Sequence, residues 1–141
     1  MIIVLFGQPT SGKSTIANYI TENSFNFINI DGDYLRKIFQ DKNYSREGRI
    51  RNLNRASDIA VYLNSLSFDI ILSLVYPYQE ARDYLNSLCE DVKWVYLTYD
   101  GERERDSYHV KDFEIPGEEV LKLNTSELSV DECISRVFPN A

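Results

Sequence analysis

The segment from Gly7 to Ser14 constrains the fold of this chain most, because its residues follow the spacing G-x-x-x-x-G-K-[ST]. The apolar run Ile2–Phe6 precedes this segment, and a helical pattern follows it from Ser14. Two glycines let the backbone wrap around phosphate groups, and the N–H groups at a helix N-terminus favour an anion. In such a loop Lys13 reaches the β- and γ-phosphates, and the Ser14 hydroxyl binds Mg²⁺. The sequence therefore predicts a strand, a loop that binds a nucleoside triphosphate, and a helix.

Short apolar runs alternate with helical patterns along the rest of the chain. The expected strands are Ile2–Phe6, Phe25–Ile30, Asp69–Leu74, Lys93–Thr98 and Val120–Leu123. The expected helices are Ser14–Thr21, Tyr34–Asp41, Arg46–Leu66, Gln79–Cys89 and Val130–Val137. Strands that are apolar throughout are typical of a parallel sheet with helices on both faces. We therefore expect a three-layer α/β fold with about five parallel strands, as a single domain over residues 1–141.

Residues 99–118 are the one long stretch of the sequence without a regular pattern. In kinases with a phosphate loop, a mobile lid follows the fourth strand, and active-site covers are often built from such loops. The alternative is a disordered connection. Loops of this length without a function are uncommon in compact domains, so we expect a lid.

The composition limits location and partners. The chain is 43% apolar and 26% charged, with a net charge of −7, and this acidic balance argues against a nucleic-acid partner. No apolar run reaches the length of a membrane span, and the first strand leaves no room for a leader, so we expect a cytoplasmic protein. Cys89 and Cys133 lack metal-ligand spacing and are expected to be free thiols. Four basic residues lie close together at Arg46, Arg49, Arg51 and Arg55. This cluster either binds an anionic ligand or forms a solvated helix face.

Two carboxylates, Asp31 and Asp33, follow the second expected strand with Gly32 between them. Ligands of α/β proteins bind at the carboxyl ends of parallel strands, so both side chains are expected beside the phosphates. One carboxylate would organise Mg²⁺ and the other would accept a proton from an attacking hydroxyl. Alternatively, Asp33 caps the helix that starts at Tyr34. The strand Asp69–Leu74 lacks the terminal acid of motor ATPases, and the chain has no Asn-Lys-x-Asp motif of GTPases, so both of these classes are disfavoured.

Further motifs follow in order along nearly the whole chain. They are Gly12-Lys13-Ser14-Thr15-Ile16-Ala17, Asp31-Gly32-Asp33-Tyr34-Leu35-Arg36 for D-G-D-x-x-R, Tyr44-Ser45 with Arg49, Asn52 and Arg55 for F-S-x-x-D-R-x-x-N-I-R-R, Pro77-Tyr78 with Arg82 for S-P-Y-R-x-x-R, Arg105-Asp106 for R-D, Phe113-Glu114-Ile115-Pro116 for Y-E-x-P, and Leu123-Asn124-Thr125 for L-D-T. On these motifs the chain resembles the adenylylsulfate (APS) kinase family of small kinases.

The resemblance implies transfer of the γ-phosphate of ATP, with Mg²⁺, to a hydroxyl of a small nucleotide-type acceptor, APS being the nearest candidate. It leaves a homodimer open. The implied catalytic residues are Lys13, Asp33 and Asp31, and the implied metal ligands are Ser14, Asp31 and Asp33. The implied nucleotide-binding residues are Gly7, Gln8, Pro9, Thr10, Ser11, Gly12, Lys13, Ser14, Thr15, Arg105 and Thr125. The implied acceptor-binding residues are Arg36, Tyr44, Arg49, Asn52, Arg55, Pro77, Tyr78 and Arg82, with Tyr44 stacking on the acceptor's base.

Departures from the family pattern lie mainly on the acceptor side. They are Gly48 for Asp, Arg51 for Glu, Asn54 for Arg, Tyr76 for Ser, Gln79 for Arg, and a missing K-G-L-Y segment where Ser107–Lys111 stands. His109 and Lys111 could replace lost lid contacts, but we expect His109 to be an ordinary surface residue. Three functions therefore compete: an APS kinase, a related kinase for another acceptor (a modified nucleotide, a cytidine-linked phosphoramidate or a nucleic-acid hydroxyl), and a nucleotide-binding module without transfer activity.

Overall fold

The structure is a computed structural model that describes residues 1–24, 26–101 and 109–140. Its elements are β1 (Ile2–Phe6), α1 (Lys13–Asn23), β2 (Phe27–Asp31), α2 (Gly32–Phe39), α3 (Arg46–Ser65), β3 (Asp69–Ser73), α4 (Gln79–Leu88), β4 (Val92–Thr98), β5 (Leu121–Asn124) and α5 (Val130–Val137). Within these residues, the five strands form one parallel sheet in the order β2-β3-β1-β4-β5. The expected α/β fold with a parallel sheet of five strands is confirmed.

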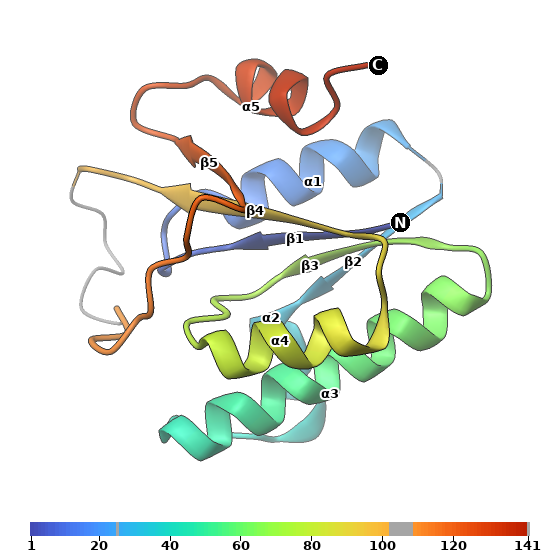
Figure 1. Cartoon of the computed structure of the whole chain (residues 1–141), viewed down its shortest axis with the longest axis vertical. Coiled ribbons are helices and arrows are strands. Elements are labelled where there is room, and N and C mark those ends of the chain that lie inside the picture. The colour runs from blue at the N-terminus through green and yellow to red at the C-terminus, as the bar shows by residue number, and fades with distance from the viewer. Residues whose placement is uncertain (25, 102–108, 141) are drawn as a thin grey trace.

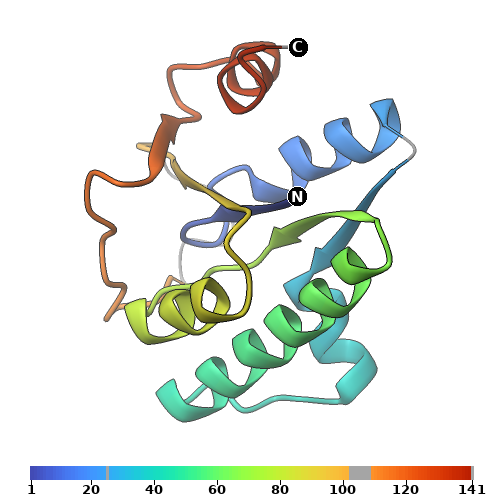
Figure 2. The same cartoon turned by 45° about the vertical axis from the view of Figure 1, so that its right-hand side comes forward.

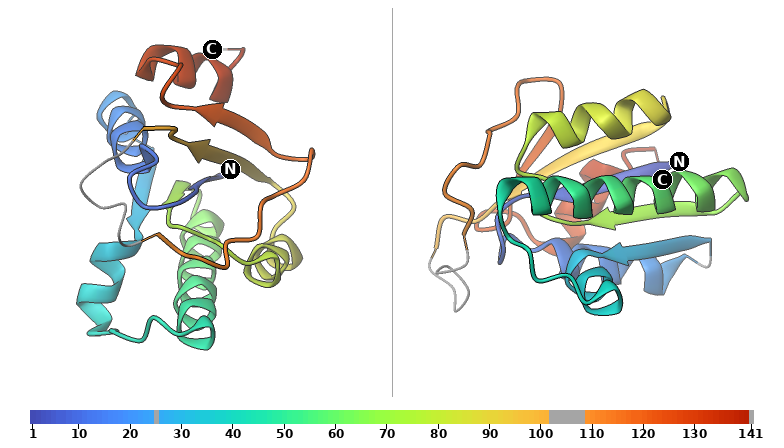
Figure 3. Two further views of the ribbon diagram at one scale, coloured as in Figure 1. Left: turned by 90° about the vertical axis from the view of Figure 1, so that its left-hand side faces the viewer. Right: turned by 90° about the horizontal axis from the view of Figure 1, so that it is seen from below.

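Helices cover both faces of the sheet. Helices α1 and α5 lie on one face, α3 and α4 lie on the other, and α2 lies next to β2 and α3 (Figures 1 and 2). Viewed from below the sheet, α3 and α4 run side by side (Figure 3). The central strand β1 is buried along its whole length, with Ile2, Val4 and Phe6 in one core and Ile3 and Leu5 in the other. Cover on both faces explains the uninterrupted apolar run in the sequence.

The bounds of the elements differ by one or two residues from those expected, most informatively at α2. This helix spans Gly32–Phe39, whereas Tyr34–Asp41 was expected. It ends because Gln40 adopts a left-handed conformation (φ 52°), and Asp41 therefore leaves the helix. Asp31 occupies the N-cap position, so the alternative of Asp33 as the helix cap is wrong. Phe25, expected to begin the second strand, lies outside the described residues.

The parallel arrangement brings the loops after β1, β2 and β3 to one edge of the sheet. These loops carry the phosphate loop, the Asp31–Asp33 turn and residues 74–78, so one edge collects the predicted chemistry. In the parts of the chain that the structure describes, no helix has both the length and the apolar character needed to span a bilayer. The expected single domain over residues 1–141 stays a prediction.

Candidate active site

The phosphate loop has a backbone path that only glycine fits at two positions. Gly7 has φ 147° and Gly12 has φ 102°. A Cβ at Gly7 would overlap the carbonyl oxygen of Leu97, and a Cβ at Gly12 would lie 3.2 Å from the Thr125 methyl group. Lys13 folds over the loop, and its Nζ donates to the carbonyl oxygens of Gly7 (3.1 Å) and Gln8 (2.8 Å). The loop therefore holds its ammonium group near the place where phosphates bind.

Thr125, the residue after β5, supports the phosphate loop. Its hydroxyl lies 2.9 Å from the carbonyl oxygens of both Ser11 and Thr98, and its backbone N–H donates to Thr98. With Gly12 and Thr15 it lines a small cavity of about 110 Å³ that extends to Cys133. Thr125 thus lies against the phosphate loop, next to a small recess. The contact with adenine that the resemblance implied stays a prediction.

A cavity of about 230 Å³ collects the residues expected to bind phosphate and metal. It is lined by Pro9, Thr10, Gly12, Lys13, Ser14, Thr15, Asp31, Asp33, Ser73, Leu74 and Val75. Burial, and secondarily the negative charge of Asp33, raise the pKa of Asp31, while Lys13 and backbone N–H groups oppose the shift. Mg²⁺ binds proteins through one or two carboxylates and substrate phosphates and keeps several waters. Two carboxylates beside a serine hydroxyl match that preference.

The loop also contains a polar atom that needs a partner. The Ser11 hydroxyl oxygen is buried and has no hydrogen-bond partner in the described residues. Because buried polar atoms are normally paired, a phosphate oxygen inside the loop would supply what this hydroxyl lacks. The residues present therefore fit a magnesium–nucleotide complex.

A larger cavity of about 630 Å³ adjoins the first. It is lined by Pro9, Gly32, Asp33, Arg36, Tyr44, Arg49, Asn52, Leu53, Leu74, Val75, Pro77 and His109. Pro9, Asp33, Leu74 and Val75 line both cavities, so they mark the junction between them. Asn52 is buried (3% exposed), and its side-chain oxygen has no hydrogen-bond partner in the described residues. The larger cavity thus offers two guanidinium groups, an aromatic ring and an unsatisfied amide to a second ligand.

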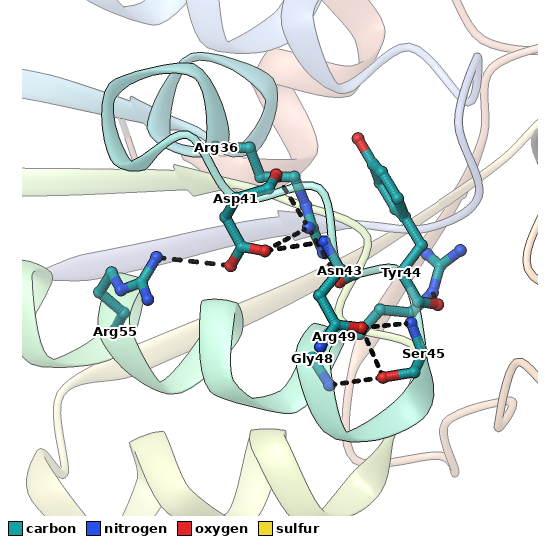
Figure 4. Close-up of polar contacts among 8 residues, drawn as sticks. All are labelled: Arg36, Asp41, Asn43, Tyr44, Ser45, Gly48, Arg49 and Arg55. Atoms are coloured by element: carbon teal, nitrogen blue, oxygen red, sulfur yellow. Dashed lines mark hydrogen bonds and ion pairs between the residues drawn. The ribbon is translucent and has the colours of Figure 1, made fainter.

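Two of the predicted acceptor-binding arginines make an ion-pair cluster around Asp41 (Figure 4). Asp41 lies 3.4 Å from Arg36 Nη1 and 3.5 Å from Arg55 Nη1. The backbone N–H of Asn43, followed by the two arginines, lowers the pKa of Asp41, so this carboxyl carries its negative charge. Arg36 still lines the cavity. Arg55 is directed to Asp41 and to the ring of Phe39 (4.2 Å) and does not line the cavity.

The connection between α2 and α3 positions Tyr44 at the cavity. Asn43 accepts hydrogen bonds from the backbone N–H (3.1 Å) and hydroxyl (2.6 Å) of Ser45, which in turn caps α3 at Gly48 (Figure 4). The Tyr44 carbonyl oxygen accepts from Arg49 Nε at 2.9 Å. The guanidinium carbons of Arg36 and Arg49 lie 4.2 Å and 5.4 Å from the Tyr44 ring centroid. Tyr44 and the two arginines therefore form one wall of the cavity.

Two other predicted acceptor-binding residues are structural in the described chain. Arg82 is buried (3% exposed), and it donates to the carbonyl oxygens of Tyr76 and Glu114 and contacts the ring of Phe6. Tyr78 is buried and donates to Asp112 at 3.0 Å. Neither lines the larger cavity, because both tie α4 to residues 112–114. Pro77 is the one residue of the motif similar to S-P-Y-R-x-x-R that lines the larger cavity. Arg105 lies outside the described residues.

Sequence reasoning missed His109 as a cavity residue and Gln8 as its support. His109 is exposed, as expected of a surface residue, but it also lines the larger cavity, and its Nε2 lies 3.1 Å from the Pro9 carbonyl oxygen. The Gln8 side chain makes two hydrogen bonds of 2.8 Å with the backbone of Val110. Both contacts join residues about one hundred positions apart, so no local pattern could reveal them.

Comparisons with known proteins agree with the motifs. A model of the adenylylsulphate kinase family matches residues 1–108. A protein of Aeropyrum pernix named probable adenylyl-sulfate kinase is 31% identical over 96 residues, which cover 64% of this chain and 52% of that protein. A cytidine diphosphoramidate kinase of Campylobacter jejuni is 31% identical over 103 residues, which cover 70% and 61% of the two chains. The chain thus spans between half and two thirds of the length of these relatives.

A solved structure shares the fold over almost the whole chain. The Mycobacterium tuberculosis APS kinase in complex with AMPPNP and APS has a TM-score of 0.78 and 20% identity, and the match covers 98% of this chain and 95% of that one. The described strands and helices therefore have the arrangement of a kinase fold. Because the family model matches well over half of its residues, this chain belongs to the adenylylsulphate kinase family.

Proposed function

We propose that this protein is an ATP-dependent kinase that transfers the γ-phosphate of ATP to a hydroxyl of a nucleotide-linked anionic acceptor, with APS as the nearest candidate. The observation that carries the proposal is the junction of the two cavities. Asp33 and Pro9 line both the cavity of the phosphate loop and the cavity walled by Arg36, Arg49 and Asn52. A donor and an acceptor bound in these two cavities would meet beside Asp33.

The chemistry follows from the residues at that junction. Lys13 and the N–H groups of the phosphate loop hold the triphosphate and stabilise charge on the transferring group. Ser14, Asp31 and Asp33 would hold Mg²⁺, which neutralises phosphate charge when bound. Asp33 orients the acceptor hydroxyl and takes its proton. The hydroxyl oxygen bonds to the γ-phosphorus as the bond from that phosphorus to the bridging oxygen of ADP breaks.

The acceptor is held by the wall formed by Arg36, Tyr44 and Arg49, with Asn52 beneath it. Guanidinium groups pair with phosphate or sulfate oxygens in two-point contacts, and an aromatic ring stacks on a base. The amide of Asn52 would gain the hydrogen-bond partner that it lacks.

A cytidine diphosphoramidate is the second candidate acceptor. The Campylobacter jejuni relative with 31% identity bears the name of that activity. The cytoplasmic location and the homodimer expected earlier stay predictions.

A coupled assay for ADP, followed by mass spectrometry of the products, tests the proposal. We expect APS or cytidine diphosphoramidate to accelerate ADP release and to gain one phosphoryl group. Asp33→Asn should reduce kcat by about 10²- to 10⁴-fold, the range of a general base. ATP binding without a phosphorylated product from either acceptor, or from a wider set of nucleotides, would leave only a nucleotide-binding module.

A further inference from the structure

His109 lies at the edge of the acceptor cavity nearest to the phosphate loop. It lines the larger cavity, and its Nε2 lies 3.1 Å from the carbonyl oxygen of Pro9. A carbonyl oxygen only accepts hydrogen bonds, so Nε2 carries the proton in this contact. Pro9 lines both cavities. The imidazole is therefore anchored at the junction that the phosphoryl group must cross.

Contacts of the residues that follow His109 hold this segment in position. The next residue, Val110, is buried (5% exposed), and its backbone N–H and C=O both pair with the side-chain amide of Gln8. Farther along, Asp112 accepts from the hydroxyl of Tyr78, and Glu114 accepts from the first backbone N–H of α4 at 2.8 Å. Residues 109–114 are thus tied to the phosphate loop at one end and to α4 at the other. A side chain on such a segment is held in place before any ligand binds.

The polar groups that line the cavity around His109 are of two kinds: those that suit the anion and base of a nucleotide, and those that suit a hydroxyl. The charged side chains that line the same cavity are Asp33, Arg36 and Arg49. The two guanidinium groups flank the Tyr44 ring, which suits the anionic and base portions of a nucleotide. Asp33 and the Pro9 carbonyl, at the junction, are acceptors that suit a hydroxyl. His109 stands with this second group, where the reactive hydroxyl must lie.

We propose that His109 is a specificity-determining residue that contacts the sugar portion of the nucleotide-type acceptor beside its reactive hydroxyl. This inference rests on the function proposed above. Lys111, two residues farther on, is exposed and does not line the cavity, which makes it a matched control.

The chain contains a single histidine, so its imidazole gives one unambiguous NMR signal. We would label histidine at ¹³Cε1 in the full chain, saturate the protein with Mg²⁺ and AMPPNP, and titrate APS, AMP, CMP and pyrophosphate in parallel. We expect a saturable shift of the signal with a nucleotide probe, at a midpoint that matches calorimetry, and an unchanged response in Lys111→Ala. A stationary signal while calorimetry reports binding, or no saturable shift with any probe, overturns the proposal.

Kinetics with the same acceptor provide the second readout. His109→Ala should raise the KM for that acceptor about tenfold, equivalent to one lost polar contact, while the KM for ATP changes less than about twofold. His109→Gln should recover part of the loss, because its amide can still donate to Pro9. Equal increases of both KM values would make His109 a support of the loop only. A shift of the NMR signal without any phosphorylated product contradicts the proposed activity, not the contact.

Discussion

At the scale of single residues, the arginines of this chain divide into ligand-facing and structural groups. Arg49 lines the acceptor cavity, whereas Arg82 is buried against the carbonyl oxygens of Tyr76 and Glu114. Both match the family motifs equally well, so sequence alone gives them the same role. The structure separates them by what surrounds each guanidinium group.

This division predicts that one alanine variant weakens acceptor binding and the other lowers stability. Arg49→Ala should raise the acceptor KM about 10- to 100-fold, since a charged hydrogen bond contributes about 1.5–3 kcal/mol, with little change in Tm. Arg82→Ala should lower the free energy of unfolding by about 2–4 kcal/mol, because it leaves buried carbonyl oxygens unpaired. Steady-state kinetics and thermal unfolding of both variants check the prediction. A normal Tm for Arg82→Ala combined with a raised acceptor KM would contradict it.

The ionised form of Asp31, which would hold Mg²⁺, is expected to lower the stability of the fold. Burial and the charge of Asp33 raise its pKa above the ordinary 3.8, so the folded state binds this proton more tightly than the unfolded state. Ionisation of Asp31 therefore costs stability as the pH rises through its folded pKa. Asp31→Asn should stabilise the protein by about 1 kcal/mol at pH 7, and the gain should vanish below about pH 4, near the unfolded value. Thermal unfolding across this pH range is the measurement, and a lower Tm at pH 7 would contradict the prediction.

At the scale of elements, the connection between α2 and α3 depends on Gly48. A Cβ at this position would lie 2.6 Å from the Asn43 carbonyl oxygen and would overlap its side chain. Only a residue without a side chain lets the connection close against α3 and hold Tyr44 at the cavity. The Asp that the family carries at this position is therefore incompatible with the connection seen in this chain.

Gly48→Ala should lower the free energy of unfolding by about 1–3 kcal/mol, as overpacking does, and should raise the acceptor KM by displacing Tyr44. The control is Gly117→Ala, where the three atoms nearest to a Cβ all belong to the flexible side chain of exposed Glu119. Urea unfolding and acceptor kinetics of the two variants test the prediction. Equal behaviour of both variants would show that the connection tolerates a side chain at residue 48.

The same connection shows how far sequence patterns reach. The resemblance assigned Arg49, Asn52 and Arg55 alike to the acceptor, and the first two do line the cavity. Arg55 instead pairs with Asp41, because Gln40 ends α2 in a left-handed turn and brings that carboxylate to it. Apolar runs and the phosphate loop specify strands and their ends through local physics. The partner of a long charged side chain such as Arg55 depends on which other segments fold against it, and local sequence patterns do not specify this.

At the scale of the whole molecule, ligand binding and stability are linked through the phosphate loop. The loop joins β1 to α1, and it contacts Thr125, the residue after β5, through Ser11. It also contacts His109 through Pro9 and Val110 through Gln8. A nucleotide that binds only the folded loop stabilises the entire fold. At one hundred times its Kd, Mg²⁺·AMPPNP should add about 2.7 kcal/mol to the free energy of unfolding.

Lys13→Ala should abolish most of this stabilisation at the same ligand concentration while leaving the unliganded Tm within a few degrees. Its ammonium group donates to the carbonyl oxygens of Gly7 and Gln8, and these two hydrogen bonds lie at a partly exposed site. Differential scanning fluorimetry with and without ligand gives both values. An equal ligand-induced rise of Tm in the variant would mean that the loop does not bind the phosphates through Lys13.

The central place of β1 has a consequence for how the chain reaches its native state. Its neighbours in the sheet are β3 and β4, which follow it by more than sixty and more than eighty residues, respectively. A nascent chain therefore presents Ile2–Phe6 long before either partner has been synthesised, and pairings of such long range close slowly. During that interval the most apolar strand of the molecule has two open edges, so chaperone capacity should govern the yield of this protein in a cell.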